Sequence, residues 1–600
     1  AFLEGNIGKV LSAVPVVLIM VLVFSLIEAF LILPHHIKGA LAAQPRPSRF
    51  HQGVQRGFDW TREHMLGPLI DRAVEWRYLL LGLVAFVVLA AVSLVVGGQV
   101  GFRAFPDLEG DTMEARILMP QGTPLARTRA VADRILDGLD ELDTATRASH
   151  PEGRSLIRAR FVRLGENRDV SENGAHLASV VVDLIANEER HVPVAELLRR
   201  WREAVGTVPD ATVVTYKEPI IGPGGRAIEI RIRGDELATL GRAADELQRW
   251  LARFDGVTDL HHDLREGKPE IRLTLEEGAR ALGLDSRMLA DQVRAALTGD
   301  MAAELQLGPE TVEVNVLSSR AGRDAVTDLE TFPIHLPDDG MVPLGAVADF
   351  AWDRGLAQIN RIDGARVVTL TGDVDRARLN VNQLLDKALA EVVPEIEARY
   401  PGIAINLEGE RAEQAETGAS MRRAFLIGVL AMFVLLSFLF RSYAEPLIVL
   451  LAIPTAAIGV VLGHLAMGLD LSMPSVLGFA ALAGIVVNDS ILLVTFVKIR
   501  ARELGDVVAA AKQASRDRFR AVVLTSLTTI AGITPIMFET SLQAQVLIPL
   551  VTSLAFGLLA STVLVLIVVP CAFAVLHDLE LATTARGDAA TGGAQPAAGD

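Results

Sequence analysis

The sequence has almost no cysteine and few aromatic side chains. Cys571 is the single cysteine among 600 residues, so no intrachain disulfide can form. Aromatic residues account for 5% of the chain although 50% of it is hydrophobic, so the apolar character comes from Val, Leu, Ile and Ala. A soluble protein of this length would seldom be so apolar, and the composition therefore indicates a membrane protein.

Signatures of several other protein classes are also missing. The sequence lacks the pattern GxxxxGK followed by Ser or Thr, which argues against ATP as the energy source. No Ser-His-Asp or Cys-His constellation stands out that would support hydrolysis. The formal net charge of −16 argues against nucleic acid as a partner. We therefore predict no catalytic residues, no nucleotide, no other cofactor and no enzyme activity.

Histidine is present, but its spacing does not suggest a metal centre. His35 and His36 are adjacent in the sequence, and so are His261 and His262. Metal-binding histidines on a helix are typically four residues apart, on one face. We predict no metal site.

Seven hydrophobic runs are long enough to cross a bilayer or nearly so, given that a helical crossing takes roughly 20 apolar residues. A polar stretch separates the second run from the third. The runs cover residues 10–33 (interrupted by Glu28), 78–97, 425–440, 447–467, 476–497, 521–538 and 546–576.

The distribution of Lys and Arg predicts the orientation of these runs. The connections 35–77 and 498–520 are rich in Lys and Arg, whereas 464–475 and 539–546 contain neither. Cytoplasmic connections carry an excess of Lys and Arg, so the connections 35–77 and 498–520 and the C-terminus are expected in the cytoplasm. The polar region 98–421 then faces the other side of the membrane. In a Gram-negative cell that side is the periplasm, and the membrane is the inner membrane.

The polar region alternates strand-like and helix-like patterns, and the order strand, helix, strand occurs twice. Residues 112–119 alternate polar and apolar, 124–142 have helical periodicity, and 177–185 again resemble a strand. A second unit runs from 227 to 260 and resumes at 367–407, with 266–355 inserted between its parts. The Gly- and Pro-containing residues 221–225 form a turn-rich joint.

These patterns predict a membrane α-helical bundle of about seven transmembrane helices with a large α+β periplasmic region. That region is built from two split β-α-β (ferredoxin-like) subdomains plus an inserted α+β subdomain. Because the first residue is Ala and lies at the edge of an apolar run, we expect an upstream part to be missing. The expected divisions are 1–37 (transmembrane helix), 38–77 (cytoplasmic linker with an amphipathic interfacial helix), 78–97 (transmembrane helix), 98–221 (first α+β subdomain), 222–265 with 356–421 (second α+β subdomain), 266–355 (inserted subdomain), 422–578 (transmembrane helices) and 579–600 (disordered cytoplasmic tail).

The most informative residue lies within the fifth run. Asp489, flanked by Asn488 and Ser490, is placed in the middle of an otherwise apolar segment. A carboxylate at that depth costs about 2.5–3.5 kcal/mol on insertion scales and is by default a candidate for an ion or proton pathway. The alternative is a structural acid that is hydrogen-bonded locally and never titrates.

Five local segments resemble the C-terminal half of a resistance-nodulation-division (RND) efflux permease of the drug or hydrophobe-amphiphile type. They are SLIEAFLILPHHIK (25–38), FRSYAEPLIVLLAIPTA (440–456), GIVVNDSILLVTFVK (484–498), RFRAVVLTSLTTIAGITPI (518–536) and VVPCAF (568–573), which resemble parts of spans six, eight to nine, ten, eleven and twelve. The resemblance covers about residues 1–578. It implies that 98–221 is the first porter subdomain, that 222–265 with 356–421 is the second porter subdomain and that 266–355 is an inserted α+β docking subdomain.

The resemblance implies a homotrimer that is driven by proton antiport. It also implies an N-terminal half that this chain does not contain, a periplasmic adaptor protein, an outer-membrane channel and surrounding membrane lipid. A relay through Asp489, Asn488, Ser490, Thr525 and Arg518 is expected. Drug pumps of the family carry a lysine where this chain has Asn488, so the relay charge is arranged differently here. Other roles are open for some of these residues. The alternative for Thr525 is a hydroxyl that is hydrogen-bonded within its own helix, and the alternative for Arg518 is to anchor its helix at the lipid headgroups. For Glu28, which also lies inside a span, we expect a packing role.

The resemblance also suggests a substrate path past Phe161, Met113 and Met119, although core packing is the alternative for each. Because the methionines outside the membrane are scattered and no thiolate lies there, we expect small organic substrates that are hydrophobic or amphiphilic. Two other functions stay open. One is export of heavy-metal cations by the same fold, and the other is a non-transporting assembly or sensing subunit.

Overall fold

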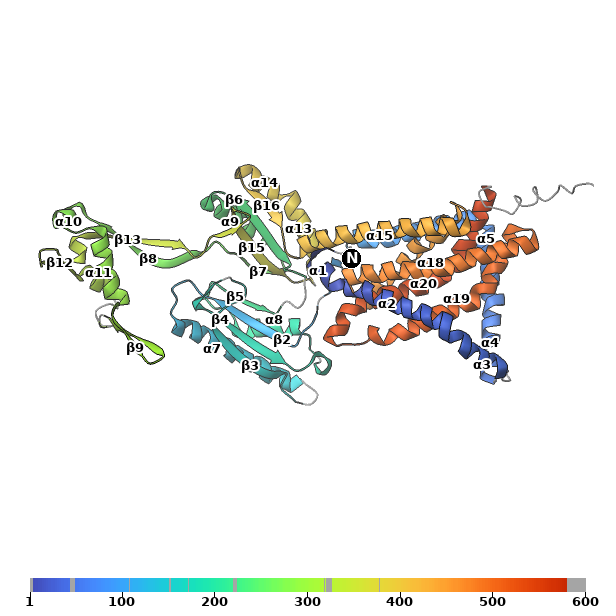
Figure 1. Cartoon of the computed structure of the whole chain (residues 1–600), viewed down its shortest axis with the longest axis horizontal. Coiled ribbons are helices and arrows are strands. Elements are labelled where there is room, and N and C mark those ends of the chain that lie inside the picture. The colour runs from blue at the N-terminus through green and yellow to red at the C-terminus, as the bar shows by residue number, and fades with distance from the viewer. Residues whose placement is uncertain are drawn as a thin grey trace, which may run out of the picture.

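The computed structural model describes residues 4–43, 49–106, 108–149, 153–170, 172–190, 192–219, 224–317, 319, 326–376 and 378–579. The molecule is elongated (Figure 1). Long helices gather at one end, two α/β units lie side by side next to them, and a smaller unit lies at the far end. Most of the joint at 221–225 and all but the first residue of the tail at 579–600 fall outside the described residues.

Seven helical segments among the described residues are long and apolar enough to cross a membrane, as the seven runs predict. Several are longer than the runs, because a helix can continue as a polar helix beyond the bilayer. The segments are 5–38, α6 (Arg77–Val96), α15 (Glu410–Phe440), α16 with α17 (Glu445–Leu450 and Ala452–Met467), α18 (Met473–Leu504), α19 (Val507–Met537) and α20 (Leu542–Asp578).

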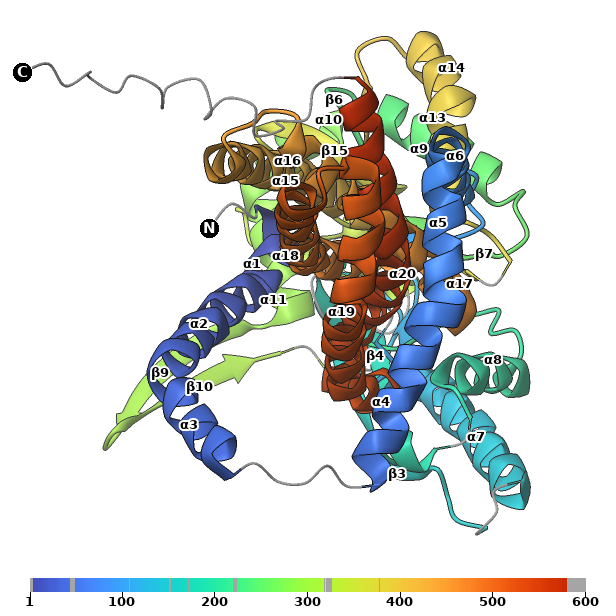
Figure 2. The ribbon, with the colours of Figure 1, turned by 90° about the vertical axis from the view of Figure 1, so that its right-hand side faces the viewer.

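The first segment stands apart from the other helices. It comprises α1 (Gly5–Leu11), α2 (Ala13–Ile27), a π-helical turn (Glu28–Ile32) and α3 (Leu33–Ala43). None of its most apolar stretch is buried. Figure 2 shows α2 and α3 diverging from α18, α19 and α20. Glu28 is exposed at the start of the π-helical turn.

An amphipathic helix follows, as its sequence predicts. α4 (Arg49–Thr61) and α5 (Gly67–Glu75) are joined by a π-helical turn, and their apolar face packs on α19 and α20. The ring centres of Phe58 and Phe519 are 6.2 Å apart. Asp71 accepts a hydrogen bond of 2.7 Å from Arg516. This helix is therefore fixed to the end of the bundle by both apolar and charged contacts.

The bundle core lies among α17, α18 and α20, where small residues allow close approach of the helices. A Cβ atom on Gly459 would lie 2.2 Å from the carbonyl oxygen of Phe556, and one on Gly478 would lie 2.4 Å from that of Leu550. Both positions therefore require glycine. Such contacts hold α18 in a fixed position against α20.

The first α/β unit has a four-stranded antiparallel sheet in the order β3-β4-β2-β5, with β2 at Thr112–Leu118, β3 at Ile157–Glu166, β4 at Asn173–Leu184 and β5 at Val213–Lys217. Alternate residues of β2 and β4 face α7 (Leu125–Ser149) and α8 (Val194–Val205), and Trp201 is fully buried there. Every expected element forms, and β5 is an additional strand.

The second unit has a five-stranded sheet. β15 (Ala365–Val374) pairs with β6 (Ile228–Gly234), β7 (Val257–His262) and β14 (Asn360–Ile362), and β16 (Ala404–Leu407) pairs with β6. The isoleucines of β6 pack against α9 (Leu237–Leu251), α13 (Val381–Ala390) and α14 (Val392–Arg399). Residues 381–399 therefore form two consecutive helices on this sheet.

The far unit is reached through a two-stranded ribbon of β8 (Glu266–Leu275) and β13 (Ala348–Leu356). It contains α10 (Glu277–Ala281), α11 (Ser286–Thr298), α12 (Val326–Glu330) and the pair β11 (Pro333–His335) and β12 (Met341–Pro343). A hairpin of β9 (Asp300–Leu307) and β10 (Glu310–Val316) is exposed along its whole length.

Candidate functional site

α18 carries the intramembrane carboxylate. The helix begins with a capping box in which Ser472 and Ser475 satisfy each other's backbone N–H groups, and it ends at Gly505, whose φ is +68°. Asn488 is exposed, Asp489 is half-buried and Ser490 is buried. Asp489 therefore lies at the edge of the bundle, between a packed face and an open face.

The hydroxyls predicted to serve a relay are bonded to their own helices. Ser490 donates to the carbonyl of Val486 at 2.9 Å, and Thr525 donates to that of Ala521 at 2.9 Å. This pattern is common for Ser and Thr inside helices and corresponds to the alternative considered for Thr525. Neither hydroxyl binds Asp489 in this structure.

Arg518, on α19, lies against α18. Its guanidinium carbon is 4.8 Å from the ring centre of Phe496, and its Nε is buried without a hydrogen-bond partner. Phe496 follows Asp489 by seven residues, which is two helical turns along the same face. Arg518 is also the cation whose field acts on Asp489. Asp489 thus lies within electrostatic range of Arg518, although the direct contact of Arg518 is with Phe496, whereas Arg520 is exposed.

A second charged contact lies nearer the end of the same helix. Lys498 of α18 donates to both carboxylate oxygens of Glu445, at 2.9 and 3.1 Å, and the side chain of Glu445 is fully buried. Lys498 also lies 5.7 Å from the centre of the Phe440 ring. Sequence reasoning assigned no role to Glu445, although an acid between Arg441 and a hydrophobic run was a visible signal.

The residues predicted to line a substrate path are not grouped together. Phe161 is 43% exposed on β3, with Arg163 over its ring at 5.3 Å. Met113 and Met119 are 0% and 1% exposed and lie in the hydrophobic core of the first unit. The positions of the two methionines correspond to the core-packing alternative.

Buried charges bridge the two α/β units, and sequence reasoning missed them. Arg116, Lys217 and Arg226 all donate to one oxygen of Asp169, at 2.6 to 2.9 Å. Burial opposes the charge of Asp169, but Lys217 and Arg116 outweigh it, so the pKa of this carboxyl lies below its ordinary value. Arg226 directly precedes the second unit, so this cluster links the two units.

A second bridge joins α8 to β7. Arg202 donates to Asp259 at 2.8 Å, and burial raises the pKa of Asp259 to about 6 although Arg202 opposes the rise. Asp259 has a φ of +53°, which Asp and Asn tolerate better than most residues.

The histidines have local partners. His261 contacts the carbonyl of Asp259 at 2.8 Å, and His262 contacts the carboxylate of Asp245 at 3.0 Å. In the part of the chain that the structure describes, no three His, Cys, Asp or Glu side chains are grouped so that they could hold a metal ion.

Comparisons with known proteins identify relatives along most of the chain. The cobalt-zinc-cadmium resistance protein CzcA of Cupriavidus metallidurans is 24% identical over 532 residues, which are 85% of this chain and 48% of CzcA. The cation efflux system protein CzcA of an Alcaligenes species matches to the same extent. The chain therefore spans about half the length of the curated relatives it matches.

Solved structures show the same fold. Two crystal forms of a heavy metal efflux pump superpose with TM-scores of 0.71 and 0.70, at 19% and 18% sequence identity. The matches cover 86% and 87% of this chain and 52% of the pump in each case. Residues 1–577 match the sequence profile of the AcrB/AcrD/AcrF family, whose members are multi-pass RND transporters of the inner membrane. The chain therefore belongs to the AcrB/AcrD/AcrF family of RND permeases.

Proposed function

We propose that this chain is the C-terminal half of a proton-driven RND efflux permease. Its family membership, its seven apolar helices and its coverage of about half of each relative support this proposal. Permeases of the family usually form trimers and work with an adaptor and an outer-membrane channel. In the proposal, the α/β units face the periplasm and the missing half supplies the remaining spans.

The carboxylate of Asp489 is proposed to bind and release the transported proton. Its half-buried place in mid-span and the nearby cation Arg518 support this role. Asn488 is exposed beside it, on the face that is open in this chain. In the proposal that face meets the N-terminal half, whose acids complete the relay.

The proposed substrate is a heavy-metal cation. Sequence reasoning preferred organic compounds, but the curated relatives are named for cobalt, zinc and cadmium resistance and for cation efflux. This similarity is the observation that carries the proposal. Among the described residues no three His, Cys, Asp or Glu side chains are grouped so that they could hold a metal ion, so the proposal assigns no cation-binding residue in this chain.

Export of hydrophobic or amphiphilic compounds is the second candidate. Met113 and Met119 give it no support, because they lie in the core of the first unit and are available neither to a soft cation nor to an organic substrate. Phe161, by contrast, is an exposed aromatic side chain on β3.

A susceptibility panel with the full-length gene separates these functions. A deletion strain would be exposed to zinc, cobalt and cadmium salts and, in parallel, to dyes and detergents. We expect hypersensitivity to the metal salts, reversal by the wild-type gene and no reversal by an Asp489→Asn gene expressed at the same level. Hypersensitivity to dyes and detergents alone would establish the second candidate. An unchanged strain would favour a non-transporting subunit.

A further inference from the structure

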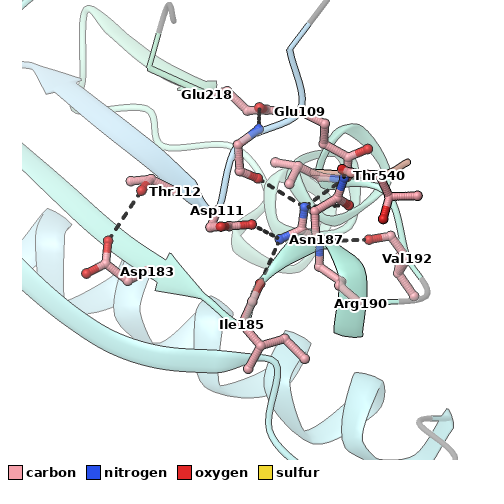
Figure 3. A network of polar contacts seen from close by, with 12 residues as sticks. Glu109, Asp111, Thr112, Asp183, Ile185, Asn187, Arg190, Val192, Glu218 and Thr540 are labelled. Atoms are coloured by element: carbon pink, nitrogen blue, oxygen red, sulfur yellow. Dashed lines mark hydrogen bonds and ion pairs between the residues drawn. The ribbon is translucent and has the colours of Figure 1, made fainter. Parts of the chain in front are cut away.

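The connector between α19 and α20 contacts the first α/β unit directly. The side-chain amide of Gln545, in the first turns of α20, accepts a hydrogen bond from the backbone N–H of Glu109 at 2.8 Å. Its NH2 group donates to the carbonyls of Glu109 and Thr540, at 3.4 and 3.2 Å. Asn187 also donates to the carbonyl of Thr540, at 3.4 Å (Figure 3). Two separate side chains thus join the membrane bundle to this unit.

Arg190 holds the contacted segment rigidly inside the unit (Figure 3). Its side chain is 0% exposed, and Nη2 donates to the carboxylate of Glu109 at 2.9 Å and to the carbonyl of Gly110 at 3.0 Å. The remaining donors reach the carbonyls of Ile185 and Val192, at 3.1 and 3.2 Å. Buried, charge-assisted hydrogen bonds of this kind are strong and fix geometry.

The carboxylate of Glu109 extends this rigid connection to α8. The same oxygen that binds Arg190 accepts a hydrogen bond from the backbone N–H of Val194, the first residue of α8, at 2.8 Å. On the other side, the chain continues from Glu109 into β2. A displacement of Glu109 therefore moves both the sheet and α8.

α19 and α20 also connect this contact with the candidate proton site. α19 carries Arg518, and α20 is tied to α19 in mid-membrane by a 2.6 Å hydrogen bond from Thr562 to Ser526. From Arg518 to the end of α19 is about 20 residues, or about 30 Å of continuous helix. A shift of α19 near Asp489 can therefore reach Thr540 and Gln545 through the short connector 538–541 that joins α19 to α20.

The second α/β unit is attached to a different span. β16 is followed almost directly by α15, which runs into the membrane as one helix, and Arg376 pairs with Glu410 at its start at 2.6 Å. The two units are thus connected to different helices. Relative movement of α15 and the α19–α20 pair would change the contact between the units, where Arg202 meets Asp259.

We propose that Gln545, Glu109 and Arg190 form a coupling joint through which the α19–α20 pair moves the first α/β unit relative to the second during transport. This inference rests on the proposed function. Gln545 is a positioning residue, because it acts through Glu109 and touches no substrate. Glu109 and Arg190 pass the movement on to β2 and α8.

The test uses the full-length permease with the substitutions Gln545→Leu and Asn187→Ala. Gln543→Leu is the matched control, because Gln543 is exposed two residues earlier on the same helix. One readout is efflux of zinc and of a fluorescent amphiphile from cells. The other is the distance between spin labels at Glu141→Cys on α7 and Glu395→Cys on α14, both exposed positions, measured with and without Asp489→Asn.

We expect Gln545→Leu to lower efflux about tenfold, which corresponds to about 1.4 kcal/mol, at unchanged protein level. Asn187→Ala should have a smaller effect, and Gln543→Leu none. Asp489→Asn should shift the label distance in the parent and in Gln543→Leu, but not in Gln545→Leu. If Gln545→Leu behaves like Gln543→Leu in both readouts, the joint is wrong. If the parent exports neither compound, the proposed function is wrong. The label distances alone then test whether Gln545 couples the helices to the first α/β unit.

Discussion

The guanidinium carbon of Arg518 lies 4.8 Å from the ring centre of Phe496, on the face of α18 that also carries Asp489. The arginine is therefore folded onto a neighbouring helix. A cation held there can attract the charged form of Asp489 and can respond when that charge changes. This contact makes Arg518 the described cation most directly linked to the proposed proton carrier.

Loss of this cation should impair transport. Arg518→Gln in the full-length permease is expected to lower efflux about tenfold, or about 1.4 kcal/mol, because Asp489 loses its nearby positive charge. Efflux from cells with matched protein levels measures the effect. Arg520→Gln is the control, because Arg520 is exposed on the same helix. Equal efflux by the two variants would assign Arg518 a role in anchoring only.

The pair of Glu445 and Lys498 should stabilise the bundle. Glu445 is fully buried, so Glu445→Leu leaves Lys498 without its carboxylate partner and should lower the free energy of unfolding by about 3 kcal/mol. Thermal unfolding of the full-length protein in detergent measures this loss. The double variant Glu445→Leu with Lys498→Met should recover most of the stability. A double variant as unstable as the single one would show that the unpaired charge is not the cause.

Asp259 should make the contact between the α/β units sensitive to pH. Burial raises its pKa from 3.8 to about 6, so the folded protein binds this proton more tightly than the unfolded chain does. Its stabilising contribution is complete below about pH 4 and is lost as the pH rises through about 6, a change of about 3 kcal/mol. Asp259→Asn mimics the protonated form and tolerates the positive φ.

The melting temperature of Asp259→Asn at pH 7.5 should therefore exceed that of the wild type, and the two should converge near pH 4. Thermal unfolding of the full-length protein in detergent, recorded from pH 4 to pH 7.5, tests the direction of this pH dependence. A variant that is less stable than the wild type at pH 7.5 would show that the ion pair with Arg202 outweighs the cost of burial.

Close packing of α17 on α20 should not tolerate a methyl group. A Cβ atom at position 459 would lie 2.2 Å from a backbone oxygen, so Gly459→Ala must separate the helices and should cost about 1–3 kcal/mol. Detergent-dependent aggregation and thermal unfolding would report the loss. Gly82→Ala on α6 is the control, because the structure describes no atom within 4 Å of its Cβ position. Equal stability of the two variants would contradict the packing described for Gly459.

Much of the fold follows from local sequence patterns. Long apolar runs mark the seven spans because a bilayer requires them, and alternation along β2 and β4 marks a half-buried sheet. The ends of the helices were harder to predict from the sequence. Residues Glu410–Met421 are polar, and yet they form the first part of α15. β5 was missed because a short strand of five residues gives little periodicity.

The candidate site was predicted only in part. A carboxylate in an apolar helix is conspicuous by itself, so Asp489 could be found from the sequence alone. The contact of Glu445 with Lys498 joins residues 53 apart, and that of Glu109 with Gln545 joins residues 436 apart. No local pattern encodes such pairs, because they depend on how the helices and sheets assemble.

Proton movement through the reconstituted full-length permease tests the central claim, that Asp489 carries the transported proton. Proteoliposomes with an imposed pH gradient and an internal pH dye would receive zinc, and the rate of gradient dissipation would be recorded for the wild type, Asp489→Asn and empty vesicles. We predict that zinc accelerates dissipation in the wild type and that Asp489→Asn is indistinguishable from empty vesicles. Dissipation by Asp489→Asn at the wild-type rate would contradict the account.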